Sequence, residues 1–218
     1  MFDINIAAGT SIGVFQNEGT LGFAVKDRNA KRYGMTCSHV AAPWFKQPNK
    51  DPVFSLDHVG TGGSRQMIAT VTDWTIINVH GVNTADAALI QLQDGVDVSN
   101  TRLQRRAPLK FFEGRLEDYD AMRSQTVSVI SAREAIPALI NGVENNLVLG
   151  FSGRLFRFAN VLSYSGSFQP GDSGAAVVDS SSQILGLHFA GERSGRLGYC
   201  ITMLKILEAF QEYELRVM

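Results

Sequence analysis

Short apolar runs bounded by turn residues recur along most of this chain of 218 residues. The runs are rich in Val, Ile, Phe and Tyr, and the intervals are rich in Gly, Pro, Asn and Asp, a pattern that predicts strands joined by turns. In the first half we expect strands at residues 19–25, 33–37, 67–79 (one long strand or two) and 85–92. Ser38–Ala42 is a predicted single helical turn, and residues 46–65 have the composition of a loop.

The second half repeats this pattern after a polar, charge-rich stretch at residues 93–117. Its predicted strands lie at residues 126–130, 146–151, 155–163, 175–178, 184–191 and 197–201. Residues 203–213 place Leu204, Leu207 and Phe210 at helical spacing, which predicts a helix.

Two groups of short strands followed by one helix predict an all-β fold, with two packed β-barrels and a C-terminal helix. We expect the first barrel at residues 1–100, a connection at 101–118, the second barrel at 119–202 and the helix at 203–218.

Charge and composition narrow the classes of partner. The chain carries 20 basic and 21 acidic residues and has no basic run, so neither a nucleic acid nor a membrane is expected as a partner. Residues 1–15 show neither the basic leader nor the apolar core of a signal peptide. The two cysteines, Cys37 and Cys200, are too few for a secreted disulfide framework, so a cytoplasmic protein with reduced, buried thiols is expected.

A serine between glycines is the first candidate for chemistry. Ser173 stands in Gly171–Gly174, after a Pro-Gly turn and before an apolar run that predicts a buried strand. Such a serine is displayed at the rim of the core beside free backbone N–H groups, which is the geometry that a nucleophile and its oxyanion need. The alternative is an ordinary turn between two strands.

A serine nucleophile needs a base and a group that orients the base. Of the four histidines, His39 follows a predicted strand directly, whereas His58 and His80 lie in polar segments and are expected to be solvated. Asp86 opens an apolar strand and is the preferred orienting acid, with Asp73 as its competitor.

Three segments of the chain resemble motifs of the chymotrypsin/trypsin-like serine peptidases: residues 36–39, 86–89 and 171–174. Thr-Cys-Ser-His is similar to the Thr-Ala-Ala-His segment of that family, Asp-Ala-Ala-Leu to its Asp-Ile-Ala-Leu, and Gly-Asp-Ser-Gly to its motif of the same letters. The order His, Asp, Ser and the separations of 47 (86 − 39) and 87 (173 − 86) are similar to the family's, which are about 45 and about 93. The resemblance covers about residues 18–210 and is strongest to the intracellular bacterial and plant narrow-leaf-like branch.

This resemblance implies two chymotrypsin-like, six-stranded-type barrels, the first carrying the histidine and aspartate and the second the serine. It implies a serine endopeptidase acting on a protein or peptide substrate. Ser173 is then the nucleophile, His39 the base and Asp86 the orienting acid, while the Gly171 and Ser173 amides form the oxyanion hole. No cofactor and no metal are implied, and no two histidines have the spacing of metal ligands.

Two departures from the family's pattern leave room for an alternative function. Asp172 matches the acid that pairs with a freed N-terminal Ile or Val amine in secreted members, but no such motif is present, so its partner is open. Ala175 replaces a glycine. An activating partner or a fused sensor domain would fit a regulated protease, and the rival interpretation is a latched or non-catalytic interaction module. An α/β-hydrolase is excluded because Gly-x-Ser-x-Gly is absent around Ser173 and the order of residues differs.

The substrate pocket is also assigned through the resemblance. Ser167 corresponds to its base, Phe168 follows it, and the wall comes from His188, Phe189, Ala190 and Gly191. His188 resembles the histidine with which glutamate-specific members receive an acidic side chain at P1, the substrate residue before the cleaved bond. Small or apolar P1 side chains, and basic ones attracted by Glu192, remain alternatives.

Overall fold

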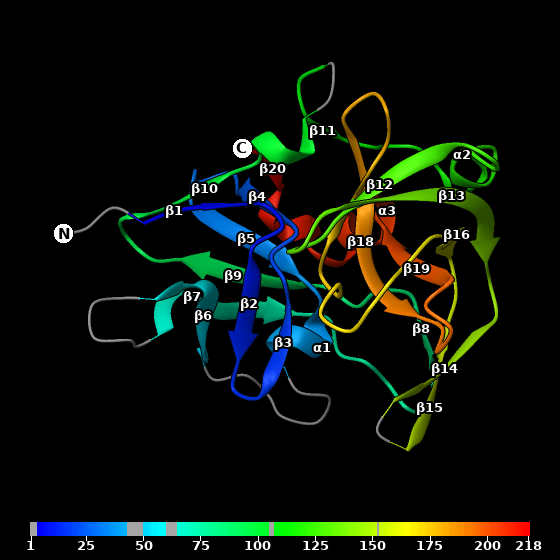
Figure 1. Ribbon diagram of the computed structural model, residues 1–218, viewed down its shortest axis with the longest axis horizontal. Coiled ribbons are helices and arrows are strands. Elements are labelled where there is room, and N and C mark those ends of the chain that lie inside the picture. The colour runs from blue at the N-terminus through cyan, green and yellow to red at the C-terminus, as the bar shows by residue number, and fades with distance from the viewer. Residues whose placement is uncertain (1–3, 43–49, 60–64, 105–106, 152) are drawn as a thin grey trace.

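The computed structural model describes residues 4–42, 50–59, 65–104, 107–151 and 153–218 of the chain. Its strands form two main groups (Figure 1): the first comes from the N-terminal half, shown blue to green, joined by the C-terminal β20, and the second comes from the C-terminal half, shown green to orange. In the part of the chain that the structure describes, only short helices interrupt the strands, so a mostly-β fold is confirmed.

The first group is one sheet in the order β20-β4-β5-β9-β7-β6-β2-β3. The strands of this sheet are β2 (Ser11–Val14), β3 (Asn17–Thr20), β4 (Phe23–Lys26), β5 (Arg32–Thr36), β6 (Pro52–Val59), β7 (Arg65–Trp74), β9 (Ala88–Leu92) and β20 (Arg216–Val217). Only Leu21 and Gly22 separate β3 from β4, so the sheet turns sharply there. Beside it, β1 (Ile4–Ala7) pairs in parallel with β10 (Val96–Ser99).

The second group closes into a six-stranded barrel. Its order is β18-β17-β12-β13-β16-β19, and β19 pairs with β18 to complete the ring. The strands of the barrel are β12 (Thr126–Ile130), β13 (Ala135–Glu144), β16 (Val161–Ser165), β17 (Ala176–Val178), β18 (Gln183–Gly191) and β19 (Leu197–Thr202). The short β11 (Lys110–Phe111) extends it in parallel from β18.

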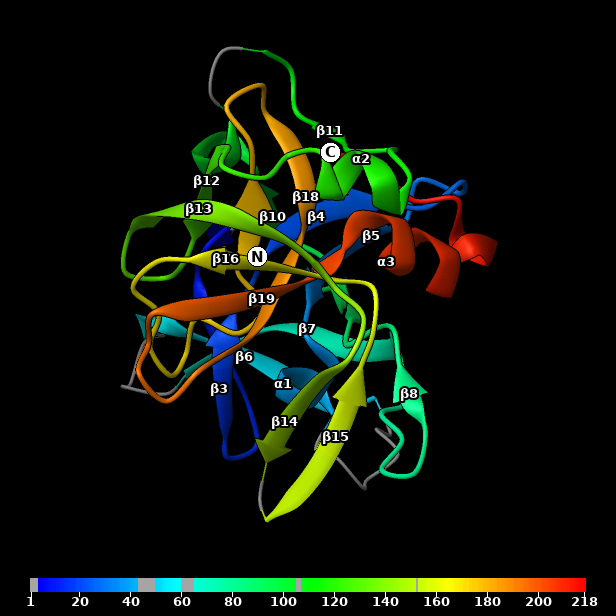
Figure 2. The ribbon, with the colours of Figure 1, turned by 90° about the vertical axis from the view of Figure 1, so that its right-hand side faces the viewer.

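A small third sheet joins the two halves. The hairpin of β14 (Leu147–Phe151) and β15 (Arg154–Phe158) pairs in parallel with β8 (Val82–Asn83) of the N-terminal half, at the lower edge of the molecule in Figure 2.

Helices occupy little of the chain. They are α1 (Ser38–Ala41), α2 (Leu116–Asp120) and α3 (Met203–Ala209), with 3-10 turns at Thr101–Leu103 and Gln211–Tyr213. No helix within the described residues is long and apolar enough to cross a membrane.

The two halves share a hydrophobic core. Leu21, Leu89 and Val40 of the N-terminal half belong to the same buried cluster as Phe189 and Ile201 of the C-terminal half, and all are at most 1 % exposed. A second cluster, around Tyr119 and Tyr164, fills the interior of the closed barrel. The halves are therefore packed against each other by burial of apolar surface, which makes their boundary a rigid place for a site.

Several elements differ from the sequence-based expectations. Residues 52–59, expected in a loop, form β6, and the expected connection at 93–117 holds β10, β11 and α2. No strand was expected at 131–145, but β13 lies there, and its residues alternate between buried and more exposed although it contains Pro137 and the Asn-Gly pair at 141–142, residue types that are depleted in strands. The expected helix over 203–218 ends at Ala209, and the chain then returns to the first sheet as β20, because Val217 pairs with Val25.

Candidate active site

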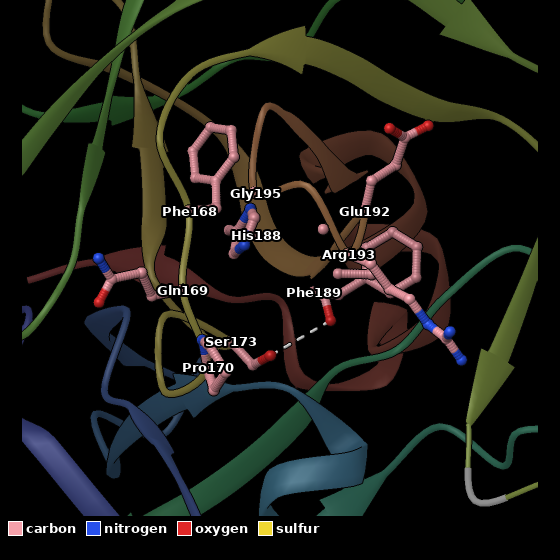
Figure 3. A pocket seen from close by; sticks show the side chains of 11 residues that line it. Phe168, Gln169, Pro170, Ser173, His188, Phe189, Glu192, Arg193 and Gly195 are labelled. Atoms are coloured by element: carbon pink, nitrogen blue, oxygen red, sulfur yellow. Dashed lines mark hydrogen bonds between the residues drawn. The ribbon is translucent and has the colours of Figure 1, made fainter.

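Ser173 lies at the end of a tight turn, just before β17. The turn closes with a hydrogen bond from the Asp172 amide to the Gln169 carbonyl at 3.2 Å, and Gly171 has φ of 95°, a value that favours glycine. Ser173 is half-buried, and its hydroxyl donates to the Phe189 carbonyl at 3.3 Å (Figure 3). The hydroxyl is therefore displayed beside the strand that forms the wall of a pocket.

Thr20 of the N-terminal half holds this turn in place. Its amide donates to the Ser173 carbonyl at 2.7 Å, and its hydroxyl donates to the Gly171 carbonyl at 2.8 Å. Gly174 has φ of 96°, and a Cβ there would lie 2.1 Å from the Thr20 carbonyl oxygen, so only glycine fits. The sharp bend between β3 and β4 thus docks directly onto the serine turn.

His39 and Asp86 form a close pair. His39 lies in α1, directly after β5, and its Nδ1 is 2.6 Å from the Asp86 carboxylate; the other carboxylate oxygen accepts the His39 amide at 3.1 Å. Asp86 is fully buried, whereas the His39 side chain is 15 % exposed. Ser38 helps to fix the pair, because its hydroxyl reaches the Ala87 carbonyl at 3.2 Å.

The segments that carry the pair and the serine converge on one carbonyl. The His188 carbonyl accepts the Gly174 amide at 2.8 Å and the Cys37 thiol at 3.3 Å. Gly19 lies between the same segments, since a Cβ there would be 2.6 Å from Val40 and 2.8 Å from the Ser173 carbonyl oxygen. The structure therefore places α1 and the serine turn on two sides of Gly19.

The competing acid lies elsewhere. Asp73 is in β7, where it accepts the Trp74 amide at 2.8 Å; burial and, after it, the nearby Asp73 raise the pKa of Tyr213. His80 is exposed, and the side chain of His58 lies outside the described residues. Of the two candidate acids, Asp86 is the one that contacts His39.

Asp172 has the partner that the sequence left open. Arg133 donates to both of its carboxylate oxygens, at 3.1 and 3.0 Å, and the Gln169 amide donates to one of them at 2.8 Å. Sequence reasoning missed Arg133 because a single arginine in the turn between β12 and β13 carries no motif.

The amides of the serine turn remain available. Within the described residues, the N–H groups of Gly171 and Ser173 donate to no protein acceptor. No atom lies within 4 Å of a Cβ built on Gly171, so its outer side is open. Two free donors beside the Ser173 hydroxyl can stabilise a developing negative charge on a bound oxygen.

A pocket of about 320 Å³ opens beside Ser173 (Figure 3). Its lining residues are Phe168, Gln169, Pro170, Ser173, His188, Phe189, Ala190, Gly191, Glu192, Arg193 and Gly195. All the residues expected to form the substrate pocket line it except Ser167, which is exposed on the surface, while Phe168 takes the inner position.

His188 lies at the inner wall of this pocket and is held on two sides. Its Nδ1 is 2.7 Å from the Tyr164 hydroxyl, and its ring stacks on Phe168 with 4.8 Å between centroids. Burial lowers the pKa of His188 to about 4, although the nearby Asp172 acts in the opposite direction. The imidazole is thus neutral at pH 7, so it offers little charge attraction to the acidic side chain that the resemblance to glutamate-specific members implies.

Cys37, His39 and Asp86 place potential metal ligands within 4.8 Å of one another. Their donor atoms are otherwise engaged: burial raises the pKa of the Cys37 thiol, which donates to a carbonyl, and Nδ1 of His39 faces Asp86. This donor set does not suit a metal, which needs a thiolate and free imidazole nitrogens.

Solved structures share this fold over nearly their whole length. Protease A of Thermobifida fusca is 15 % identical, with 98 % of each chain covered and a TM-score of 0.66. The chymotrypsin of Cellulomonas bogoriensis is 16 % identical, with 99 % of each chain covered and a TM-score of 0.64. A glutamic-acid-specific serine protease described as using a histidine triad in substrate binding is 17 % identical, with a TM-score of 0.62 over 98 % of this chain and 100 % of that one.

No curated protein matches the sequence. The family model described as the trypsin-like peptidase domain matches residues 19–187, which include His39, Asp86 and Ser173. The chain therefore belongs to the trypsin-like peptidase domain family, and its fold is chymotrypsin-like.

Proposed function

We propose that this protein is a serine endopeptidase that cleaves peptide bonds through an acyl-enzyme, with Ser173, His39 and Asp86 as its catalytic triad. The observation that carries the proposal is the contact of 2.6 Å between the buried Asp86 and His39 Nδ1, on a helix that only Gly19 separates from the Ser173 carbonyl. Such a carboxylate fixes the imidazole tautomer and leaves Nε2 to accept a proton.

The reaction follows from these positions. Ser173 Oγ attacks the carbonyl carbon of the scissile bond while His39 Nε2 takes the hydroxyl proton, and the carbonyl oxygen becomes an oxyanion. His39 then gives that proton to the leaving amine as the C–N bond breaks. Water, activated by the same imidazole, hydrolyses the Ser173 ester and restores the free enzyme.

The free amides of Gly171 and Ser173 would bind the oxyanion. Such donors are effective because they are fixed before the charge develops, and each contributes about 10²–10³-fold to turnover in related chemistry. Here the fixation comes from Thr20 and from the Arg133–Asp172 pair, which together hold the turn from both sides.

Several finer assignments belong to the same proposal. We place the site between two barrels and take the sheet that contains β2–β7 and β9 as the first of them. We also assign the chain to the narrow-leaf-like branch. We also propose a cytoplasmic location, supported by two buried, unpaired cysteines, Cys37 and Cys200. The Arg133–Asp172 pair favours a protein that is competent without a freed N-terminal amine, and an activating partner or sensor domain would act through the turn at 169–172.

Labelling with a fluorophosphonate probe tests the proposal. The purified chain should react at Ser173, and the Ser173→Ala and His39→Ala variants should not. Ser167→Ala is the matched control, since it removes an exposed serine of the same loop and should label normally. A folded chain that neither labels nor cleaves peptides would support the alternative, a latched or non-catalytic interaction module.

A further inference from the structure

We propose, building on the serine endopeptidase function above, that the pocket selects a neutral carboxamide side chain, glutamine or asparagine, at P1, and that His188 donates the selecting hydrogen bond. The pocket is continuous from Ser173 to His188, because both residues line it (Figure 3). A P1 side chain that enters beside the nucleophile therefore ends near the imidazole.

Tyr164 fixes which nitrogen of His188 carries the proton. The phenol is fully buried, and within the described residues Nδ1 of His188 is the one partner of its hydroxyl. Burial raises the pKa of Tyr164 well above its ordinary value, so the phenol keeps its hydrogen. Because this buried hydroxyl has no other acceptor among the described residues, it donates its hydrogen bond to Nδ1. A neutral imidazole that accepts at Nδ1 must carry its hydrogen on Nε2.

Nε2–H is then a donor in need of an acceptor. No described residue makes a hydrogen bond with Nε2, and His188 lines the pocket although its residue is only 2 % exposed. Nε2 is not among the sealed polar atoms of the described residues, so water or a ligand in the pocket can reach it. A ligand that displaces water and leaves such a donor unpaired loses a hydrogen bond, and a site built around the donor discriminates strongly against it. The carbonyl oxygen of a carboxamide satisfies this donor.

The charges around the pocket disfavour a carboxylate there. Phe168 stacks on one face of the imidazole, and the buried Asp172 is close enough to act on the pKa of His188. Glu192 and Arg193 both line the pocket and have opposite charges, so together they add no net cation. An acidic P1 side chain would lose its hydration for one neutral donor, whereas a carboxamide loses far less.

The experiment is a peptide library varied at P1, with kcat/KM measured at pH 7.5 for matched peptides with Gln, Asn, Glu, Asp, Leu and Lys. We expect the better carboxamide to exceed its isosteric acid and Leu by about tenfold or more, corresponding to one well-formed hydrogen bond. In Tyr164→Phe, Nε2 is no longer forced to carry the hydrogen, so the ratio of kcat/KM for the carboxamide to kcat/KM for its isosteric acid should fall several-fold. Fluorophosphonate labelling of Ser173 should persist in this variant.

Two control variants separate selectivity from folding. Tyr119→Phe removes another buried phenol of the same barrel, whose hydroxyl donates to the Leu185 carbonyl at 3.2 Å, and it should leave the P1 ratios unchanged. His80→Ala removes an exposed histidine and should do the same.

Each result decides a different question. The carboxamide pocket is overturned if an enzyme that labels at Ser173 prefers an acidic P1 residue, a basic one or Leu. The proposed function stands in each of these cases. Equal ratios in Tyr164→Phe and wild type overturn the role of the tautomer. Absence of both labelling and cleavage overturns the proposed function itself, and the pocket proposal with it.

Discussion

Arg133 holds both carboxylate oxygens of Asp172, at 3.1 and 3.0 Å, immediately before Ser173. Asp172 is 2 % exposed, so its charge would be costly without a cation. One guanidinium nitrogen, Nη2, donates to both oxygens, and the Gln169 amide donates to one of them, so the carboxylate is held in the turn that begins at Gln169. The pair therefore helps to fix the position of the Gly171 and Ser173 amides, for which we propose the oxyanion-binding role.

Loss of this partner should weaken both stability and reactivity. In Arg133→Ala we expect the free energy of unfolding to fall by about 1–3 kcal/mol, because the buried Asp172 carboxylate loses its cation. The loss is smaller than for a fully buried pair, since the Arg133 side chain is partly exposed to water. The rate of fluorophosphonate labelling should fall about tenfold as the turn loosens. Arg157→Ala, at an exposed position in β15, is the control and should change neither quantity. Wild-type labelling by Arg133→Ala would show that the pair is structural only.

The triad should act as a unit. Ser173→Ala and His39→Ala should each lower turnover by several orders of magnitude, and the double variant should be hardly worse than either single one, because each change disables the same step. The measurement is steady-state peptide cleavage with active-site titration of the wild type. Additive losses in the double variant would mean that the two side chains serve separate steps.

The two candidate acids should behave very differently. Asp86→Asn should lower turnover by about 10⁴-fold, because an amide opposite Nδ1 favours the wrong imidazole tautomer. Asp73→Asn, whose carboxylate lies near Tyr213 instead, should retain near-normal turnover. The reverse outcome would transfer the orienting role to Asp73.

Two glycines allow a test of the contact between the halves. Gly174 and Gly153 both have positive φ, of 96° and 76°, but only a Cβ at Gly174 meets the backbone, at the Thr20 carbonyl. Gly153→Ala should cost about 1 kcal/mol of stability from backbone strain alone. Gly174→Ala should cost several times more and abolish labelling, since Thr20 must withdraw from the turn. Equal thermal midpoints for the two variants would contradict the close docking of Thr20.

Much of this architecture was predictable from the sequence, because local signals were strong where strands are buried. Residues 126–130 form β12 with the expected bounds, and the run after Gly174 forms β17. The positions of His39 and Asp86 beside strands also followed from the apolar runs that adjoin them. Their contact required the pairing of β5 with β9, which no local pattern specifies.

The parts that escaped prediction depend on tertiary context. Arg133 lies in a turn and has meaning only because β12 and β17 pair, which brings that turn to Asp172. Tyr164 reads as one more strand residue, and its bond to His188 spans the interior of the barrel. Ser167 was expected inside the pocket from its distance to the serine, but Phe168 fills that place and Ser167 faces solvent.

The neutral state of His188 predicts how stability responds to acid. The ordinary pKa of 6.5 applies in the unfolded chain, and burial lowers it to about 4 in the folded one; Asp172 opposes this shift and His39 adds to it. Between these two pKa values the unfolded chain binds more protons than the folded chain. The contribution of neutral His188 to the free energy of unfolding is therefore fully present above about pH 6.5 and is lost as the pH falls toward 4. The slope from this one group is about 1 kcal/mol per pH unit near pH 5.

This slope can be isolated by difference. Urea unfolding at pH 7, 6 and 5 should be compared for His188→Gln and its parent, both carrying Ser173→Ala to prevent self-cleavage. His188→Gln is expected to be less stable at pH 7, since it loses the bond to Tyr164, but its stability should fall less steeply toward pH 5. His80→Gln, at an exposed position, should keep the parent's slope. Parallel curves for His188→Gln and its parent would mean that His188 binds a proton equally well in the folded and the unfolded chain, and would contradict the lowered pKa of His188.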